Sequence, residues 1–150
     1  MRIMIADSHP EVRAALRLLL EEDSATWIVA AEASTAIELI NKARSANPRV
    51  ILLDWNLPGL HVTPVNVDHQ RADKILVALK AIAPKARIMV MSTTADDRNT
   101  ILQAGADAFL CKSESPQQLL AAIKQLEQAL PADQAPSWSS LPNIPIEPNQ

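Results

Sequence analysis

Five short apolar runs, each followed by a segment with helical spacing of its apolar residues, are the feature that most constrains how this chain can fold. Short apolar runs bounded by turn-forming residues are typical of strands. The five runs span residues 2–6, 27–31, 50–54, 87–91 and 107–111. Because such alternation allows right-handed crossovers, it predicts a three-layer α/β/α fold around a five-stranded parallel sheet.

The third run ends on a charge. Four consecutive apolar residues, 50–53, precede Asp54, and the turn-forming pair Pro58-Gly59 follows. An apolar run without polar alternation predicts a strand that is buried on both faces. A carboxylate is costly inside a core but tolerable at the carboxyl end of a strand, where open α/β sheets bind ligands. Asp54 is therefore the first candidate functional residue.

Capping signals delimit the helical segments. Thr35 and Glu38 have the spacing of a capping box, and Ser115 and Gln118 repeat it. Gly105 follows the fourth helical segment, which we expect to begin near residue 96, and it stands where a left-handed C-cap is needed. These signals predict a helix after each strand.

Composition excludes several classes of function. The length of 150 residues and the hydrophobic content of 48% suit one domain. A net charge of −3 argues against a domain that binds nucleic acid mainly by electrostatic attraction. The two glycines, Gly59 and Gly105, exclude a dinucleotide fingerprint and a P-loop, which both need several glycines in one short loop.

The sequence also predicts a cytoplasmic location and one domain followed by a tail or linker. The apolar runs are too short to span a membrane, no signal peptide pattern opens the chain, and one cysteine, Cys111, excludes an internal disulfide. We expect a domain over residues 1–130 and a Pro-rich disordered tail or interdomain linker over 131–150, which holds five of the eleven prolines. Residues 60–72 have no sustained period and are predicted to be mainly loop.

Polar residues close four of the five predicted strands. They are Asp7, Asp54, Ser92 and Lys112. Because the carboxyl ends of parallel strands lie along one edge of a sheet, these side chains can share a crevice. Two carboxylates, a hydroxyl and an ammonium suit Mg²⁺ together with a phosphoryl group. Asp54 would then attack phosphorus as a carboxylate nucleophile and form an acyl phosphate.

This pattern resembles the receiver domain of bacterial two-component response regulators. The resemblance covers about residues 1–130 and rests on four motifs in order: IADSHPEVR, VILLDWNLPG, VMST, and AGADAFLCK with its following SESP. The motif IADSHP is most similar to the branch of the family whose members carry a C-terminal helix-turn-helix. The resemblance implies a flavodoxin-like fold with the sheet order 2-1-3-4-5.

The resemblance also implies a role for each site residue. A sensor histidine kinase would phosphorylate Asp54, while Asp7 and the backbone carbonyl of Asn56 would help to bind Mg²⁺. Ser92 and Phe109 would form the switch, and the fourth helix, fifth strand and fifth helix would carry the output. Such a domain is not an enzyme, but at most an acceptor that phosphorylates itself.

Partners follow from the same resemblance. The output surface is also a candidate for homodimer formation, because apolar residues remain to be placed there: Ile101, Leu102, Leu119 and Leu126. No nucleic acid is expected to bind this chain, and DNA would be contacted only through an effector domain that these 150 residues do not contain. Transcription regulation would be the output of such a longer protein.

Two departures from the family pattern concern the site and the following loop. Receivers usually have two adjacent acidic residues after the first strand, and here the second position is Ser8. The lost attraction to a divalent cation at about 4 Å is on the order of 2 to 8 kcal/mol before desolvation. Ser8 acting through a water, or Glu11 reaching back, are the available substitutes, so we expect Mg²⁺ binding to be weakened. The segment at 60–72 is also about ten residues longer than usual.

Two alternatives remain open. A pseudo-receiver would use the same fold as a protein-interaction module that signals without phosphorylation, because its Mg²⁺ site is impaired. A small phosphatase or phosphotransferase would use Asp54 as its nucleophile, but the position two residues later holds Asn56 in place of an acid–base carboxylate.

Structural roles would also explain individual residues. Asp7 and Ser8 would serve as caps of the first helix, with Ser8 and Glu11 as a capping box. Phe109 and Cys111 would be core residues. His9 stands at a helix start and needs no catalytic role. Histidines and aspartates after the third strand match no metal-ligand spacing and are expected to be solvated: His61, Asp68, His69 and Asp73.

Overall fold

The computed structural model describes residues 1–61 and 69–129, which form alternating strands and helices. The strands are β1 (Arg2–Ala6), β2 (Ile28–Ala33), β3 (Val50–Asp54), β4 (Arg87–Ser92) and β5 (Ala108–Cys111). The α-helices are α1 (Pro10–Asp23), α2 (Ala36–Ala46), α3 (His69–Ile82), α4 (Arg98–Gln103) and α5 (Pro116–Ala129), and a 3-10 turn, η1 (Ala95–Asp97), leads into α4.

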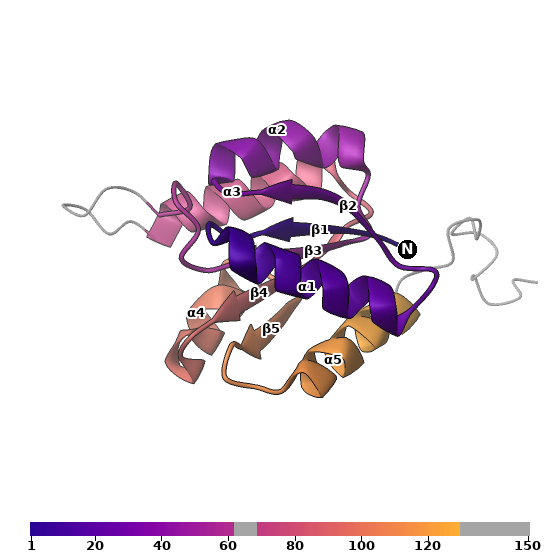
Figure 1. Ribbon diagram of the computed structural model, residues 1–150. Helices are drawn as coiled ribbons and strands as arrows, with labels where there is room; N and C mark the ends of the chain where they lie inside the picture. Colours follow the sequence, from indigo (N-terminus) through magenta and orange to yellow (C-terminus); the bar gives the residue numbers. More distant parts are fainter. Residues whose placement is uncertain (62–68, 130–150) are drawn as a thin grey trace, which may run out of the picture.

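The five strands form one parallel sheet in the order β2-β1-β3-β4-β5. Helices α1 and α5 cover one face of the sheet, and α2, α3 and α4 cover the other (Figure 1). The predicted fold class and strand order are thus confirmed. No helix in the described part of the chain is long and apolar enough to cross a bilayer.

Strand β3 is the centre of both cores. Val50 and Leu52 pack with α1 and α5, while Ile51 and Leu53 pack with α2, α3 and α4. All five residues of β3 are buried, including Asp54. Because alternate side chains of a strand point to opposite faces, an apolar run without alternation fits this doubly covered position.

Both predicted capping boxes exist, one of them in altered form. Ser115 and Gln118 bond reciprocally: the backbone N–H of Gln118 donates to the Ser115 hydroxyl at 3.2 Å, and that of Ser115 donates to the Gln118 side chain at 2.8 Å. The backbone N–H of Glu38 donates to the Thr35 hydroxyl at 3.1 Å, but the Glu38 carboxylate accepts from Ser34, one residue before the cap.

Several predicted boundaries are wrong. Strand β2 runs from Ile28 to Ala33 rather than over 27–31. Trp27 lies before the strand, with its side chain buried in the core and its ring N–H donating to Glu127 at 3.2 Å. The fourth helix begins with η1 and becomes α-helical only at Arg98. Gly105 has the expected positive φ, +114°.

Part of the predicted loop at 60–72 is helical, because α3 begins at His69. Leu60 and His61 belong to no helix or strand, so the start of this segment is loop as predicted, although the side chain of Leu60 is fully buried in the core on the α2–α4 side. Residues 62–68 and the predicted tail at 131–150 lie outside the described residues.

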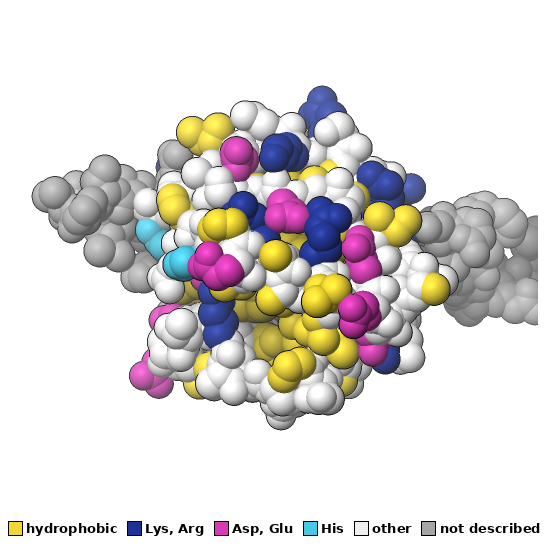
Figure 2. Space-filling view, viewed as in Figure 1, with side chains coloured by type: hydrophobic (Ala, Val, Ile, Leu, Met, Phe, Trp, Pro, Cys, Tyr) yellow, Lys and Arg dark blue, Asp and Glu magenta, His cyan; other side chains and the backbone are white. Residues whose placement is uncertain are grey.

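The expected apolar output surface is smaller than the sequence pattern suggests. Ile101 and Leu119 are buried in the two cores, and Leu102 and Leu126 remain partly exposed. Hydrophobic side chains gather instead between α1 and α5, as Figure 2 shows. They line a groove of about 430 Å³ that includes Leu16, Leu19, Leu110 and Leu119.

Leu52→Ala should destabilise the domain by about 3 kcal/mol, because it opens a cavity in the central strand. Leu18→Ala is the matched control: Leu18 is 60% exposed, so its truncation should change the free energy of unfolding by less than about 0.5 kcal/mol. Urea unfolding followed by circular dichroism measures both values. Equal losses in the two variants would contradict the central position of β3.

Candidate functional site

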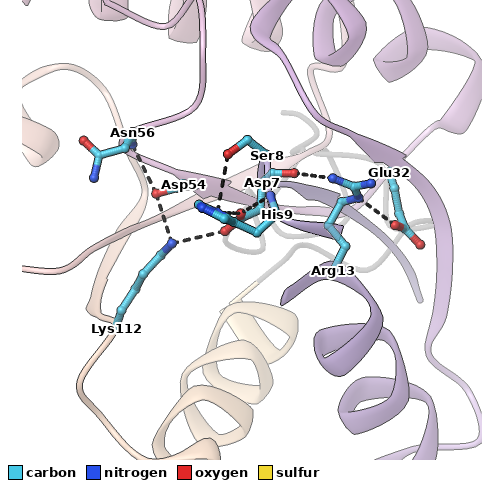
Figure 3. Close-up of polar contacts among 8 residues, drawn as sticks. All are labelled: Asp7, Ser8, His9, Arg13, Glu32, Asp54, Asn56 and Lys112. Carbon is cyan, nitrogen blue, oxygen red and sulfur yellow. Dashed lines mark hydrogen bonds and ion pairs between the residues drawn. The ribbon is translucent and has the colours of Figure 1, made fainter. Parts of the chain in front are cut away.

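Asp7 follows β1 and is fully buried. Its backbone N–H donates to the carbonyl of Ala33 at 3.0 Å, which continues the β1–β2 pairing by one residue. One carboxylate oxygen, Oδ1, accepts from the backbone N–H of His9 at 2.9 Å and lies 3.0 Å from the imidazole Nδ1 of the same residue (Figure 3). The Asp7 carboxylate is therefore held by its own turn.

Asp54 ends β3 and is 1% exposed. Its Oδ1 accepts from the backbone N–H of Asn56 at 3.1 Å. The next residue, Trp55, donates its backbone N–H to the carbonyl of Met91 at 2.8 Å, which extends the β3–β4 pairing beyond the strand. The Asp54 carboxylate consequently sits where two strands end side by side.

Lys112 comes directly after β5 and joins the two carboxylates. Its Nζ lies 3.1 Å from Oδ2 of Asp7 and 3.2 Å from Oδ1 of Asp54 (Figure 3). Its backbone N–H donates to the carbonyl of Ser92 at 2.7 Å, and its side chain crosses the end of β4, the strand between β3 and β5. Three of the four predicted strand-end residues are therefore in direct contact.

Charge balance in this cluster sets two pKa values. Burial alone would raise the pKa of Asp7, but hydrogen bonds from His9 and the ion pair with Lys112 outweigh it and hold that pKa below its ordinary value. Burial alone would lower the pKa of Lys112, and the two carboxylates hold it above the ordinary lysine value. Lys112 and Asp7 are therefore both charged at neutral pH.

Ser92 reaches the same edge but makes its contacts with the following loop. It is 1% exposed, donates its hydroxyl hydrogen to Oδ2 of Asp97 at 2.6 Å, and accepts from the backbone N–H of Thr94 at 3.3 Å. Phe109 is half-buried against the α2–α4 core, and the guanidinium carbon of Arg98 lies 5.9 Å from its ring centroid. Both predicted switch residues thus contact the start of α4.

A divalent cation would find suitable ligands here. Asp7, His9 and Asp54 each offer one ligand atom, and these atoms lie within 4.8 Å of one another. Carboxylate oxygens are ligands that Mg²⁺ prefers, and two of these three residues are aspartates. His9 is the site residue that the sequence analysis missed. Its place two residues after Asp7 puts it near the site, but residue spacing does not determine that its imidazole turns back toward Asp7.

The capping role predicted for Ser8 is wrong. The N-cap of α1 is His9, with Pro10 in the first turn, so Ser8 and Glu11 do not form the capping box. Ser8 is half-exposed, and its hydroxyl lies 3.4 Å from Nδ1 of His9. The hydroxyl is therefore next to the imidazole that contacts Asp7.

The expectation that His61 is solvated is wrong, because its side chain is half-buried against Trp55. Its Nε2 lies 2.8 Å from the carbonyl oxygen of Trp55, and its ring packs edge-on against the indole with centroids 4.6 Å apart. Asp73 is half-exposed, while Asp68 and the side chain of His69 lie outside the described residues. Trp55 links this histidine to the backbone beside Asp54.

Comparison with known proteins assigns the chain to a family. The family model described as the response regulator receiver domain matches residues 3–124. A nitrate/nitrite response regulator protein homolog of Haemophilus influenzae is 33% identical over 131 residues, which are 85% of this chain and 57% of that protein. The nitrate/nitrite response regulator protein NarP of Escherichia coli is 34% identical over 125 residues, which are 82% of this chain and 53% of that protein. The chain spans a little over half the length of these relatives.

Solved structures agree with the sequence matches. The structure of a two-component response regulator of the LuxR family from an Aurantimonas species superimposes with a TM-score of 0.68 at 28% identity, with 85% of each chain covered. A CheY-like receiver domain protein from Methanospirillum hungatei gives a TM-score of 0.65 at 24% identity and covers 85% of this chain and 94% of its own. With the family model matching most of its length, the chain belongs to the response regulator receiver domain family.

Proposed function

We propose that this domain accepts a phosphoryl group on Asp54 from a sensor histidine kinase, and that the modification changes the surface formed by α4, β5 and α5. The observation that carries the proposal is the contact of the Lys112 ammonium with two buried carboxylates, at 3.1 and 3.2 Å. A partly buried cation beside a carboxylate is suited to an incoming dianion, because the cation offsets its charge at short range.

The chemistry follows from how the Asp54 carboxylate is held. Both donors, the Asn56 backbone N–H and Lys112, contact Oδ1, so we assign Oδ2 as the attacking oxygen. Oδ2 forms a bond to phosphorus while the bond from phosphorus to the kinase histidine nitrogen breaks, and the imidazole keeps the electron pair and takes up a proton. The product is an acyl phosphate that adds close to two negative charges, and Lys112 offsets part of them.

Asp7, Asp54 and the backbone carbonyl of Asn56 are the ligands that we propose for Mg²⁺. The bound ion would neutralise phosphoryl oxygens as the negative charge on Asp54 increases. Ser8 contributes no charge at the position where receivers usually have a second acid, so its substitution weakens the metal site. The missing carboxylate at position 8 is the one observation that favours the pseudo-receiver alternative, in which the fold signals without phosphate.

The wild-type domain should gain the mass of one phosphoryl group when it is incubated with acetyl phosphate and Mg²⁺, and Asp54→Asn should gain none. Intact-protein mass spectrometry measures the gain. Because an acyl phosphate is labile toward nucleophiles, hydroxylamine should release inorganic phosphate and leave a hydroxamate on Asp54, so the mass gain of a phosphoryl group should be replaced by a much smaller one. A folded wild-type protein that gains no mass would contradict the proposal and favour the pseudo-receiver.

Ser8→Asp should bind Mg²⁺ at least tenfold more tightly than the wild type, because a restored carboxylate contributes more than about 1.4 kcal/mol to divalent binding. Titration followed by the fluorescence of Trp55, which adjoins Asp54, measures the Kd. Ser8→Asn is the matched control, since it adds a side chain of similar size without a charge. An equal Kd in all three proteins would show that the missing charge is not the cause of weak binding.

Lys112→Met should raise the pKa of Asp7 in the metal-free protein, because the buried carboxylate loses its ion pair and keeps its desolvation. In the wild type the depressed pKa of Asp7 contributes stability that is present above the unfolded value of 3.8 and is lost as the pH falls through the folded pKa. The variant should therefore lose stability at a higher pH. Carbon-13 NMR titration of the carboxylate measures the pKa.

Lys124→Met is the control for that titration. Lys124 is 52% exposed and pairs with Asp23 at 3.1 Å on the surface. Removal of this amine should leave the pKa of Asp7 unchanged, because exposed pairs are screened by solvent and salt. A similar rise in both variants would show that the pKa of Asp7 reflects net charge rather than the contact with Lys112.

A further inference from the structure

Ser92 and Phe109 lie on the same face of the sheet. Phe109 pairs with Val90 in the β4–β5 ladder, and Ser92 is two residues beyond Val90. Because side chains alternate along a strand, Val90 and Ser92 point to one side, and the side chain of Phe109 stands next to them. This is the side that α4 covers through Ile101 and Ala104.

Asp97 holds the hydroxyl of Ser92. The hydrogen bond from Oγ of Ser92 to Oδ2 of Asp97 is 2.6 Å long, which is typical of a hydroxyl that donates to a carboxylate. Asp97 is also the N-cap of α4, but its side chain makes no capping hydrogen bond to that helix. The carboxylate is therefore committed to Ser92.

Arg98 covers Phe109. Its guanidinium carbon lies 5.9 Å from the ring centroid, within the range of a cation–π contact. Arg98 is exposed and is the first residue of α4, and Phe109 is half-buried. Two consecutive residues at the junction of η1 and α4 thus contact the two proposed switch residues.

We infer that Asp97 and Arg98, here called the 97–98 pair, hold Ser92 and Phe109 in the unphosphorylated arrangement and must release both when the switch operates. The inference rests on the proposed function, since it assigns positioning residues to that switch. Ser92 has one hydroxyl hydrogen, so it cannot donate to Asp97 and to a phosphoryl oxygen at the same time. Because residues 97 and 98 are adjacent, a shift of η1 that breaks one contact moves the other.

Loss of the Asp97 carboxylate should therefore favour the switched state. Asp97→Ala should lower the Kd for beryllofluoride, measured at saturating Mg²⁺, by about 10- to 150-fold, the range expected for removing a hydrogen bond to a charged group from one state only. Asp97→Asn should have a smaller effect, because its amide oxygen still accepts. Arg98→Ala should lower the Kd as well, by about threefold.

Two controls distinguish the loss of the hydrogen bond between Asp97 and Ser92 from the loss of a negative charge. Asp96→Ala removes the same charge one residue earlier; Asp96 is exposed and its backbone N–H donates to Thr94, so the Kd should stay within about twofold of wild type. In a Ser92→Ala background, Asp97→Ala should cause no further change, because the partner of the carboxylate is already absent. Equal effects of Asp96→Ala and Asp97→Ala, or an undiminished effect without Ser92, would overturn the inference.

A second measurement needs no ligand. Phe109 is the only phenylalanine of the chain, so a phenylalanine-selective isotope label reports on its ring alone in an NMR spectrum. In the ligand-free protein, Asp97→Ala should shift the Phe109 ring signals even though Asp97 itself contacts Ser92, because loss of that contact moves the adjacent Arg98. Asp96→Ala should leave the ring signals unchanged. A wild-type domain that binds no beryllofluoride would refute the proposed function. The ring shifts would still show whether the 97–98 pair holds Ser92 and Phe109. Unshifted ring signals in Asp97→Ala would overturn the inference.

Discussion

The contacts of Lys112 with Asp7 and Asp54 are the interaction on which the carboxyl edge of the sheet depends. The two carboxylates are 0% and 1% exposed, and each would be strongly destabilising as an uncompensated buried charge. One ammonium serves both, and it reaches them across the end of β4. The ends of β1, β3 and β5 must therefore keep a common position, which the parallel pairing of the whole sheet enforces.

The sequence predicted those parts of the fold and site that depend on strand ends. Apolar runs identified the five strands, and the rule that parallel strands end at one edge brought Asp7, Asp54 and Lys112 together. The resemblance to receiver domains supplied the strand order. The reciprocal bonds of Ser115 and Gln118 also followed from spacing, because a capping box is a local geometry with few alternatives.

The contacts that the sequence did not predict depend on the direction in which a single side chain points. The imidazole of His9 turns back to Asp7, the hydroxyl of Ser92 turns forward to Asp97, and His61 packs on Trp55. Residue spacing places these groups on an element but does not determine which rotamer they adopt. Apolar periodicity likewise marked Ile101 as a candidate for the surface, whereas tertiary packing buries it.

The ion pair of Asp7 and Lys112 joins residues 105 positions apart in the chain. Such a contact belongs to the slowest class to form, because the entropy of closing a long loop opposes it until the rest of the sheet is present. A chain emerging from the ribosome has both carboxylates long before it has their cation. The cluster of Asp7, Asp54 and Lys112 is consequently a property of the finished fold, and an incompletely synthesised chain carries its two aspartates without their shared cation.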